Sequence, residues 1–445
     1  MGKIYSSAQK TIIWLGPGQE TDKSTFRRAR FGALLYRTKE HLPNRLDGIF
    51  RKTFHPFTSK PSHLSAFQPL CANPWFSRIW TLQECFLGRH PTLQSDHLQL
   101  SLSDFAEYWL FLDITQGSPF AKATPHCFSR ISSLIITTHF RSLAGTITKH
   151  RKEPLVTDVR AHVDNWWSFR KALPYFLHQA AFANTATDPR DKVYALLPIL
   201  SRFLPEFSAF PADYTAPVAH VYESFTRFLV SQTHRLGFFD LLYPKTPSVQ
   251  GLPPWVLDVG GDTSGSLFVL VGGAMCFYAA GESEVDIPLF EASPPGELHL
   301  RGARFSRVAI ISEEIPKEMD LMIDVATKYI GWLWETLPST MPGEERARVG
   351  AELLVIVKNK PVMDRLKEGG RFYLTEGWNV GISQFEIAEG DEVVVMAGGD
   401  LPLVLRRWED GKSVFMGPTV VMGTHDGEFW GRERLVEELD AWEVV

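Results

Sequence analysis

The chain has 445 residues, more than a single hydrophobic core usually holds, so we expect two domains. Hydrophobic residues make up 44% and charged residues 22% of the chain, and the formal net charge of −5 leaves no basic excess for binding nucleic acid or anionic lipid. Nucleic acid is therefore not an expected partner. The longest apolar run, residues 267–281, is too short for a membrane span, and the first residues lack the apolar core of a signal peptide.

The cysteines and histidines predict no metal site. The chain has four cysteines, Cys71, Cys85, Cys127 and Cys276. They lie too far apart in the sequence to form a metal-ligand or redox pair. Their number is also too low for a disulfide framework, so we expect buried thiols in a reducing compartment and a cytoplasmic location. The histidines show no H-x-x-x-H or paired Cys/His spacing. The polar stretch 425–428, HDGE, predicts a turn.

The first predicted element is a buried strand at residues 11–16, TIIWLG, which Gly16-Pro17-Gly18 closes. Only ten residues precede it, so either later segments flank the strand or the N-terminal part of a larger domain is absent, and we favour absence. Residues 19–70 are polar and basic with scattered apolar positions, which predicts a helix and an irregular insertion.

Residues 73–88, NPWFSRIWTLQECFLG, predict one helix with Asn73 as N-cap and Pro74 at the first helical position. Gln83 falls in the middle of its apolar face, and Glu84 lies at the edge of that face. At about 100° per residue, the face collects the side chains of Phe76, Ile79, Trp80, Phe86 and Leu87. A buried amide without partners costs about 1–3 kcal/mol, so the two polar groups predict either a hydrogen-bonded network or a functional site.

Three further helical regions are predicted. Residues 95–180 are expected to be mostly helical, with LSDFAEYWLFL and WWSFRKALPYFLHQAAF as the clearest amphipathic stretches. In TDPRDKVYALLPIL, Asp188 is expected to cap a helix, Pro189 to take its first position and Asp191 to lie in its first turn. Residues 213–232 predict a helix whose buried stripe is Val218, Val221, Tyr222, Phe225, Phe228 and Leu229.

The pattern changes after residue 259. Strands are predicted at residues 290–312, helices at 320–358 and a strand-and-turn array at 371–423, with turns at Gly398-Gly399-Asp400 and Asp410-Gly411. The predicted domains are 1–200, 201–290 as a helical and extended connector, and 291–445 as an α+β domain with an antiparallel β-array.

Six blocks occur in order along the chain: GKIYSSAQKTIIWLGP, NPWFSRIWTLQE, ATDPRDKVYALLPI, ADYTAPVAHVYESFTRFLV, LPPWVLD, and RFYLTEGWNVGI with GDEVVVMAGG and PLVLRR. Together they resemble the heterokaryon incompatibility (HET) domain proteins of filamentous fungi. The blocks up to about residue 200 correspond to the family domain, and the rest to the region that commonly follows it. Family segments like LSYxWG and WIDxxCINQ, which usually precede the first block, are missing, so we expect a truncated member or a short gene model.

The resemblance implies self/non-self recognition and programmed cell death when unlike fungi fuse. It also implies a fold similar to TIR domains, so the expected class is α/β: a partial TIR-like doubly wound sheet, a helical middle region and a small C-terminal antiparallel β-domain. On this analogy TIIWLG is the third strand of the sheet, and the helix from Asn73 follows it. The structural motif residues of the resemblance are Trp75, Gln83, Asp188, Arg190, Asp191, Lys192 and Tyr194.

Glu84 has two interpretations. Some TIR domains cleave NAD with the glutamate of a W-C-x-x-E pattern, and Trp80 and Glu84 have the same separation of four. On this analogy Glu84 is a catalytic carboxylate that stabilises the ribose of the nucleotide in a cation-like transition state. The favoured alternative is a helix-edge glutamate paired with Arg78 or Arg89, because ion-pair networks often imitate sites. For Gln83 we favour a hydrogen-bonded core amide.

The DPRDK box also has two interpretations. Arg190 and Lys192 are placed to bind a phosphate at a helix start. Asp188 and Asp191 occupy the same positive helix end and would repel an anion, so we favour capping and a salt-bridge network. Tyr194, like Tyr222, lies on an apolar face and is expected in the core.

We therefore expect a HET-type signalling protein that acts through protein–protein contacts. Its protein partners are unidentified, the sequence is compatible with formation of a homo-oligomer, and no cofactor is expected. One alternative is a NAD-cleaving hydrolase with Glu84 as the key carboxylate and NAD as its substrate. Another is an inactive truncated paralogue. Since the missing segments would form one wall of a TIR-like pocket, we expect no enzymatic activity from this chain alone.

Overall fold

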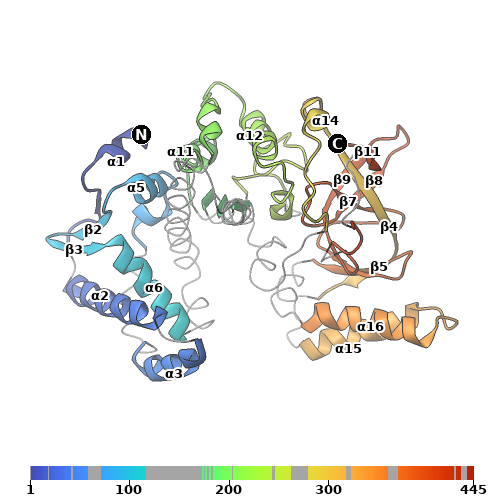
Figure 1. Cartoon of the computed structure of the whole chain (residues 1–445), viewed down its shortest axis with the longest axis horizontal. Helices are drawn as coiled ribbons and strands as arrows, with labels where there is room; N and C mark the ends of the chain where they lie inside the picture. The colour runs from blue at the N-terminus through green and yellow to red at the C-terminus, as the bar shows by residue number, and fades with distance from the viewer. Residues whose placement is uncertain are drawn as a thin grey trace, which may run out of the picture. The chain divides into compact units, whose positions relative to one another are not determined.

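The computed structural model of the chain contains two compact units, Met1–Ala212 and Asp213–Val445 (Figure 1). Both combine helices with strands, so the protein has a mixed α/β fold. Division of the chain at residues 200 and 290 stays a prediction. The structure describes residues 2–18, 20–41, 44–58, 72–116, 173–174, 176–177, 180–181, 184–202, 204–242, 246–261, 279–316, 322–358, 369–424, 427–431 and 438–445.

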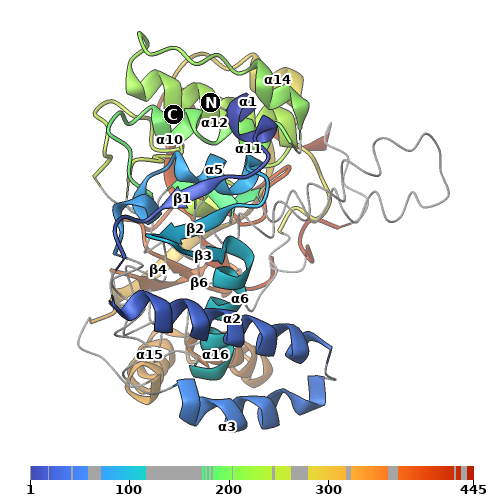
Figure 2. The ribbon, with the colours of Figure 1, turned by 90° about the vertical axis from the view of Figure 1, so that its left-hand side faces the viewer.

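A three-stranded sheet organises the first unit. Strand β1 (Ile12–Trp14) pairs in parallel with β2 (Thr92–Ser95), and β2 pairs antiparallel with β3 (Leu98–Ser101). Figure 2 shows the three strands in this order, with α2 and α6 beyond β3. The β2–β3 hairpin lies where the sequence predicted mostly helix, and its tight turn is made by Asp96, which adopts a φ of 50°.

Helices of the first unit pack through small residues. α2 (Glu20–Glu40) lies against α6 (Leu102–Gln116), and α3 (Asp47–Thr58) also contacts α6. A Cβ added to Gly32 of α2 would stand 2.2 Å from Tyr108 of α6, so only glycine allows this close approach. The helix predicted within residues 19–70 and the helix in LSDFAEYWLFL are confirmed as α2 and α6, whereas α3 lies where an irregular insertion was predicted. WWSFRKALPYFLHQAAF falls mostly outside the described residues.

The prediction of a buried strand at 11–16 is wrong for two of its three strand residues. Ile13 is buried, but Ile12 and Trp14 are each 55% exposed. A later segment, β2, does flank the strand on one side. Ile12 and Trp14 share one face of the strand because side chains alternate along it, so only the face that carries Ile13 packs on the core. The strand also forms one edge of the described sheet.

The prediction of one helix over residues 73–88 is also wrong. The segment contains a 3-10 helix, η2 (Pro74–Ser77), and a separate helix, α5 (Thr81–Leu87). Asn73 caps η2 as predicted, with its Oδ1 accepting from the Trp75 backbone N–H at 3.0 Å. Arg78 is extended because the backbone on either side of it hydrogen-bonds with Thr185, which donates to Ser77 at 2.5 Å and accepts from Ile79 at 3.0 Å.

The first unit also contains short helices. α1 (Gly2–Ser7) precedes β1, and α10 (Asp191–Tyr194), α11 (Leu197–Leu200) and η4 (Pro205–Ala209) lie near the end of the unit. The predicted helix at the DPRDK box exists but begins at Asp191 rather than Pro189, because residues 188–190 form a turn that leads into it.

Helices of the second unit match the prediction closely. α12 (Val218–Thr233) buries Val221, Tyr222, Phe225 and Leu229 of the predicted stripe, while Val218 and Phe228 are half-buried. The helices predicted at 320–358 are α15 (Met322–Thr336) and α16 (Gly343–Lys358). Two short helices, η5 (Phe239–Leu241) and α14 (Ile287–Glu291), precede the strands.

The strands of the second unit form one eight-stranded sheet in the order β10-β6-β5-β4-β11-β9-β8-β7. β4 (Leu298–Glu314) is a single long strand where two were predicted, and its additional pairing with β7 closes part of the sheet into a barrel-like form. The other strands are β5 (Arg371–Thr375), β6 (Val380–Ser383), β7 (Glu392–Met396), β8 (Leu403–Arg407), β9 (Ser413–Pro418), β10 (Val420–Val421) and β11 (Asp440–Val444).

The predicted array of antiparallel strands is thus present, apart from the contact of β11 with β9, which is parallel. The turns at 398–400 and 410–411 are also present, with Gly398 and Gly411 both at positive φ. None of the described helices combines the length and the hydropathy that crossing a membrane requires.

Candidate functional site

Glu84 lies at the centre of a hydrogen-bonded cluster in the first unit. The indole Nε1 of Trp75 donates to Glu84 Oε2 at 2.8 Å, and the Tyr5 hydroxyl donates to Oε1 at 3.4 Å. Arg78 Nη2 lies 4.0 Å from Oε1, so one of the two predicted arginine partners is close. The Glu84 side chain is 14% exposed. Both oxygens of this largely buried carboxylate therefore face donors from the protein.

Tyr5 remains a hydrogen-bond donor in this cluster. Its partial burial raises the pKa of the Tyr5 hydroxyl, and the negative charge and hydrogen bond of Glu84 raise that pKa further, against a lowering by Arg78. No sequence motif pointed to Tyr5 as a member of this cluster. Its position in the block GKIYSSAQK was the available signal, but no spacing pattern linked it to a glutamate 79 residues away.

Trp80 contacts the DPRDK box rather than Glu84. Its Nε1 donates to Asp191 Oδ2 at 3.1 Å, across 111 residues of sequence. Trp75 and Trp80 thus each present an indole N–H to a different carboxylate. The structure therefore brings the two predicted motifs, residues 73–88 and 188–194, into one network.

Gln83 joins the same two motifs from inside the core. The side chain is completely buried, and its Nε2 donates to the backbone carbonyl of Ala195 at 3.0 Å. Its Oε1 has no hydrogen-bond partner among the residues that the structure describes. The bond to Ala195 ties α5 to the turn that follows α10, which is the structural role favoured for this amide.

The charged groups of the DPRDK box are occupied by protein partners. Arg190 forms an ion pair with Asp188 at 2.9 Å, and Asp188 also accepts from the Arg190 backbone N–H. The Arg190 hydrogen bond lowers the pKa of Asp188 despite the opposing effect of desolvation. Lys192 is buried, and its Nζ donates to the carbonyls of Ala181, at 2.5 Å, and Asn184. Tyr194 lies in the core.

Gly88 sets the distance between α5 and the start of β1. A Cβ at this position would stand 2.4 Å from Thr11 Oγ1 and 2.3 Å from the Glu84 carbonyl oxygen. Asn73 makes a second link to the end of β1, with its Nδ2 donating to the Leu15 carbonyl at 2.8 Å. Residues 73–88 are therefore anchored to β1 at both ends. Cys85 in this stretch is buried and free, as expected.

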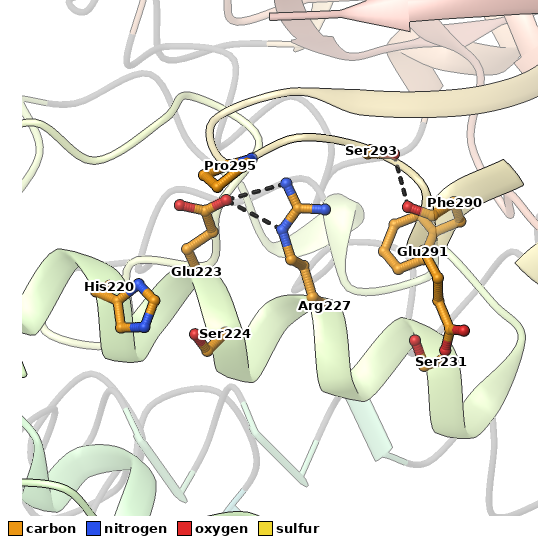
Figure 3. Close-up of a pocket in the computed structure, with 9 residues that line it drawn as sticks. All are labelled: His220, Glu223, Ser224, Arg227, Ser231, Phe290, Glu291, Ser293 and Pro295. Atoms are coloured by element: carbon orange, nitrogen blue, oxygen red, sulfur yellow. Dashed lines mark hydrogen bonds and ion pairs between the residues drawn. The ribbon is translucent and has the colours of Figure 1, made fainter. Parts of the chain in front are cut away.

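The second unit contains a pocket that the sequence did not predict. It has a volume of about 260 Å³ and lies between α12 and the segment from α14 to the start of β4 (Figure 3). It is lined by His220, Glu223, Ser224, Arg227, Ser231, Phe290, Glu291, Ser293 and Pro295. The residues of α12 recur at helical spacing, but only the fold brings residues 290–295 opposite them.

Glu297, His299 and Glu443 form a further polar cluster in the second unit, with one ligand atom of each within 4.8 Å of the others. His299 and Glu443 are direct partners in the β4–β11 ladder. Lys412 Nζ lies 2.7 Å from Glu297 Oε1, and this hydrogen bond raises the pKa of Lys412. The lysine therefore supplies positive charge directly beside one carboxylate of this cluster.

The first unit is thus a mixed α/β module whose tryptophans and carboxylates form an internal network. Residues 1–84 match the family model described as heterokaryon incompatibility protein (HET). The match includes Tyr5, Trp75, Trp80, Gln83 and Glu84, and it confirms the resemblance for this part of the chain. No curated protein and no solved structure matches the chain.

Proposed function

We propose that this protein is a recognition component of heterokaryon incompatibility that acts through protein–protein contacts and promotes programmed cell death. The observation that carries the proposal is the match to the HET family over the residues that build the Glu84 cluster. A function related to heterokaryon incompatibility follows from that family. The mode of action is inferred from the chemistry of the cluster.

The cluster favours a structural role over catalysis. Both oxygens of Glu84 face protein donors, from Trp75 and Tyr5. Asp191 accepts from Trp80, and Lys192 donates to two backbone carbonyls. Polar groups that are engaged with each other hold a scaffold in one conformation, whereas a catalytic carboxylate needs access to a substrate.

An exposed apolar edge supports contact with another protein. Ile12 and Trp14 lie on the open face of β1, which is the edge strand of the described sheet, and Ile4 of α1 is 66% exposed. Large apolar side chains on an edge strand favour association, because a partner can cover them and extend the sheet.

Expression in fungal cells tests this proposal. Induction of the intact chain should slow growth and increase uptake of a membrane-impermeant dye. The double variant Ile12→Thr and Trp14→Thr should relieve both effects, since threonine keeps the β-propensity of the strand but removes the apolar surface. Trp408→Thr is the matched control, because Trp408 is 58% exposed in the second unit. A toxic double variant at equal protein level, or no growth defect from the intact chain, would contradict the proposal.

A NAD-cleaving hydrolase is the second candidate, with Glu84 and Trp80 as its residues. Two observations favour it: the partial exposure of Glu84, and the parallel β1–β2 pair connected through helices, a connection that doubly wound TIR-like sheets contain. Purified protein would then release nicotinamide from NAD, and Glu84→Ala would abolish the release while circular dichroism remained unchanged. Absence of nicotinamide release from the intact protein argues against this candidate. Cell-based inactivity of the intact chain would instead favour an inactive paralogue.

A further inference from the structure

The pocket of the second unit has the features of a small-molecule site. We propose that it binds a small zwitterion, for which an α-amino acid is the simplest chemical class. The proposal is independent of the function proposed above, because every residue that lines the pocket lies in residues 213–445. It rests on an ordered Arg227–Glu223 ion pair in the wall of the pocket, and on the donors, acceptors and charges that face into the pocket.

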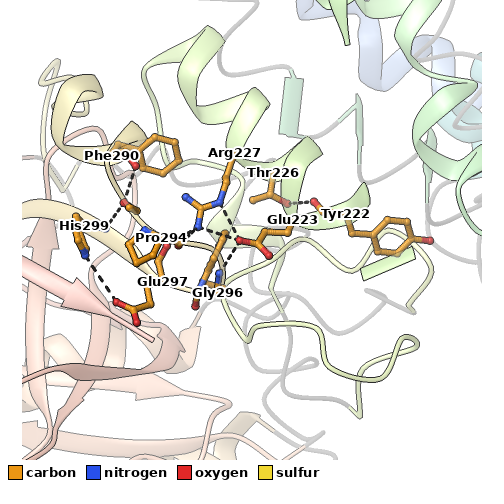
Figure 4. Close-up of polar contacts among 11 residues, drawn as sticks. Tyr222, Glu223, Thr226, Arg227, Phe290, Pro294, Gly296, Glu297 and His299 are labelled. Carbon is orange, nitrogen blue, oxygen red and sulfur yellow. Dashed lines mark hydrogen bonds and ion pairs between the residues drawn. The ribbon is translucent and has the colours of Figure 1, made fainter. Parts of the chain in front are cut away.

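Arg227 and Glu223 form an ion pair that the backbone of the pocket wall holds in place. Arg227 Nε donates to Glu223 Oε1 at 3.0 Å, and its Nη2 donates to the carbonyls of Pro294 and Glu297, each at 2.7 Å. The Gly296 backbone N–H also donates to Glu223 Oε1, at 2.8 Å. Figure 4 shows this pair on α12 facing the turn at residues 294–297. Since both side chains are held before any ligand arrives, the entropic cost of ordering them on binding is small.

One end of the pocket offers a hydrogen-bond donor with positive charge. The Arg227 side chain is only 20% exposed, and its guanidinium lies over the Trp255 ring at 5.0 Å from the ring centroid, but its Nη1 has no hydrogen-bond partner among the described residues. In Figure 3 this nitrogen points away from Glu223 and towards Phe290. A carboxylate is the acceptor that best matches a guanidinium donor in such a half-buried position.

The other end offers negative charge. Glu291 has no ion-pair or hydrogen-bond partner among the described residues, and Figure 3 shows its side chain reaching towards Ser231 of α12. The Ser224 and Ser231 hydroxyls likewise have no partner in the described part of the chain. An ammonium group would form an ion pair with Glu291 and donate a hydrogen bond to a serine hydroxyl oxygen.

The charge balance favours a zwitterion over a simple anion or cation. Glu223 already neutralises Arg227, so a plain anion would face an uncompensated Glu291. A plain cation would leave the free donors of Arg227 unsatisfied. A zwitterion satisfies both ends, and the buried ring of Phe290 between them gives an apolar contact for its carbon skeleton. A volume of about 260 Å³ suits a ligand below drug size.

Isothermal titration calorimetry and thermal unfolding of the full chain test the proposal, with each proteinogenic L-amino acid at millimolar concentration as the probe. We expect at least one amino acid to bind with one-to-one stoichiometry and to raise the unfolding temperature. Its carboxamide and its N-acetyl derivative should each bind about tenfold more weakly, because each lacks one charge-assisted hydrogen bond.

Two variants connect the binding to the pocket. Glu291→Gln should weaken the amino acid about tenfold and leave its N-acetyl derivative unaffected. Ser231→Leu should abolish binding by filling the pocket, and leucine preserves the helix. Glu389→Gln, an exposed glutamate of the same unit, is the matched control and should bind normally. The proposal is overturned if no amino acid binds, or if the carboxamide or the N-acetyl derivative binds as tightly as the amino acid itself. It is also overturned if Glu291→Gln binds the unmodified amino acid as tightly as the parent chain does.

Discussion

The indole of Trp75 donates a hydrogen bond of 2.8 Å to the carboxylate of Glu84, nine residues further along the chain. The bond crosses the extended residue Arg78 and joins η2 to α5. It therefore compensates for the break in the segment that the sequence predicted as one helix. A motif of the HET-matched region is held together by its own side chains.

Trp75→Phe should lower the free energy of unfolding by about 1–3 kcal/mol, because Glu84 loses a donor while largely buried. Urea unfolding measures the change. Glu84→Gln should cost less, since the amide oxygen still accepts from Trp75 and no charge remains to be satisfied. A loss from Glu84→Gln that equals or exceeds the loss from Trp75→Phe would contradict this prediction, because the charge of Glu84 would then contribute at least as much as the indole donor. Trp408→Phe, at an exposed position, is the control.

Gly88→Ala should destabilise the first unit by about 1–3 kcal/mol, the usual cost of overpacking. The new methyl group would overlap Thr11 Oγ1 and the Glu84 carbonyl oxygen, so α5 and β1 must separate. Gly48→Ala in α3 is the matched control. It meets no atom within 4 Å, and alanine in a helix should be neutral or stabilising. Equal thermal unfolding temperatures for the two variants would refute the close approach at Gly88.

Asp240→Asn should change the pH dependence of stability. Burial raises the pKa of Asp240 well above its ordinary value, and the negative charge of Asp400 raises it further, against a lowering by Arg235. A raised folded-state pKa means that the stability of the neutral form is present below the unfolded-state pKa of about 4 and is lost as pH rises through the folded-state pKa. Asparagine stays neutral, so the variant should gain stability relative to the parent chain as pH rises from about 4.

Urea unfolding at several pH values measures this gain. Glu409→Gln, at an exposed position in the same unit, should give a curve parallel to that of the parent chain. A parallel curve for Asp240→Asn as well would contradict the raised pKa of Asp240.

Glu392→Gln should have the opposite pH dependence. Burial raises the pKa of Glu392, but hydrogen bonds from Arg304 and Arg307 and the charge of Arg407 outweigh it and lower the pKa overall. The lowered pKa means that the stabilisation is present above the unfolded-state pKa of about 4.3 and is lost as pH falls through the folded-state pKa.

The glutamine variant should therefore be less stable than the parent chain at neutral pH, by about 1–3 kcal/mol for the lost charged hydrogen bonds. The difference should shrink in acid, where the parent chain loses the same interaction. Unfolding followed by circular dichroism from pH 7 downward checks this. A difference that stays constant in acid would contradict the lowered pKa.

Local patterns predicted most helices of this fold. The stripe on α12 and the cap at Asn73 depend on neighbouring residues, so spacing and residue type were sufficient. The break at Arg78 and the β2–β3 hairpin were not predicted. Arg78 is extended because of Thr185, more than 100 residues away, and no local pattern contains that pairing. The pocket between α12 and α14 was missed for the same reason.

The amino-acid sequence was sufficient to indicate the HET resemblance that the family model matches in residues 1–84, the lack of a basic excess in the composition, and Trp75, Trp80, Gln83 and Glu84 as candidate motif residues. Residue types and short spacings carry that information. Which tryptophan meets which carboxylate emerged only from the folded chain, where Trp75 donates to Glu84 and Trp80 to Asp191. Such pairing depends on how segments far apart in sequence pack, because hydrogen bonds form between neighbours in space.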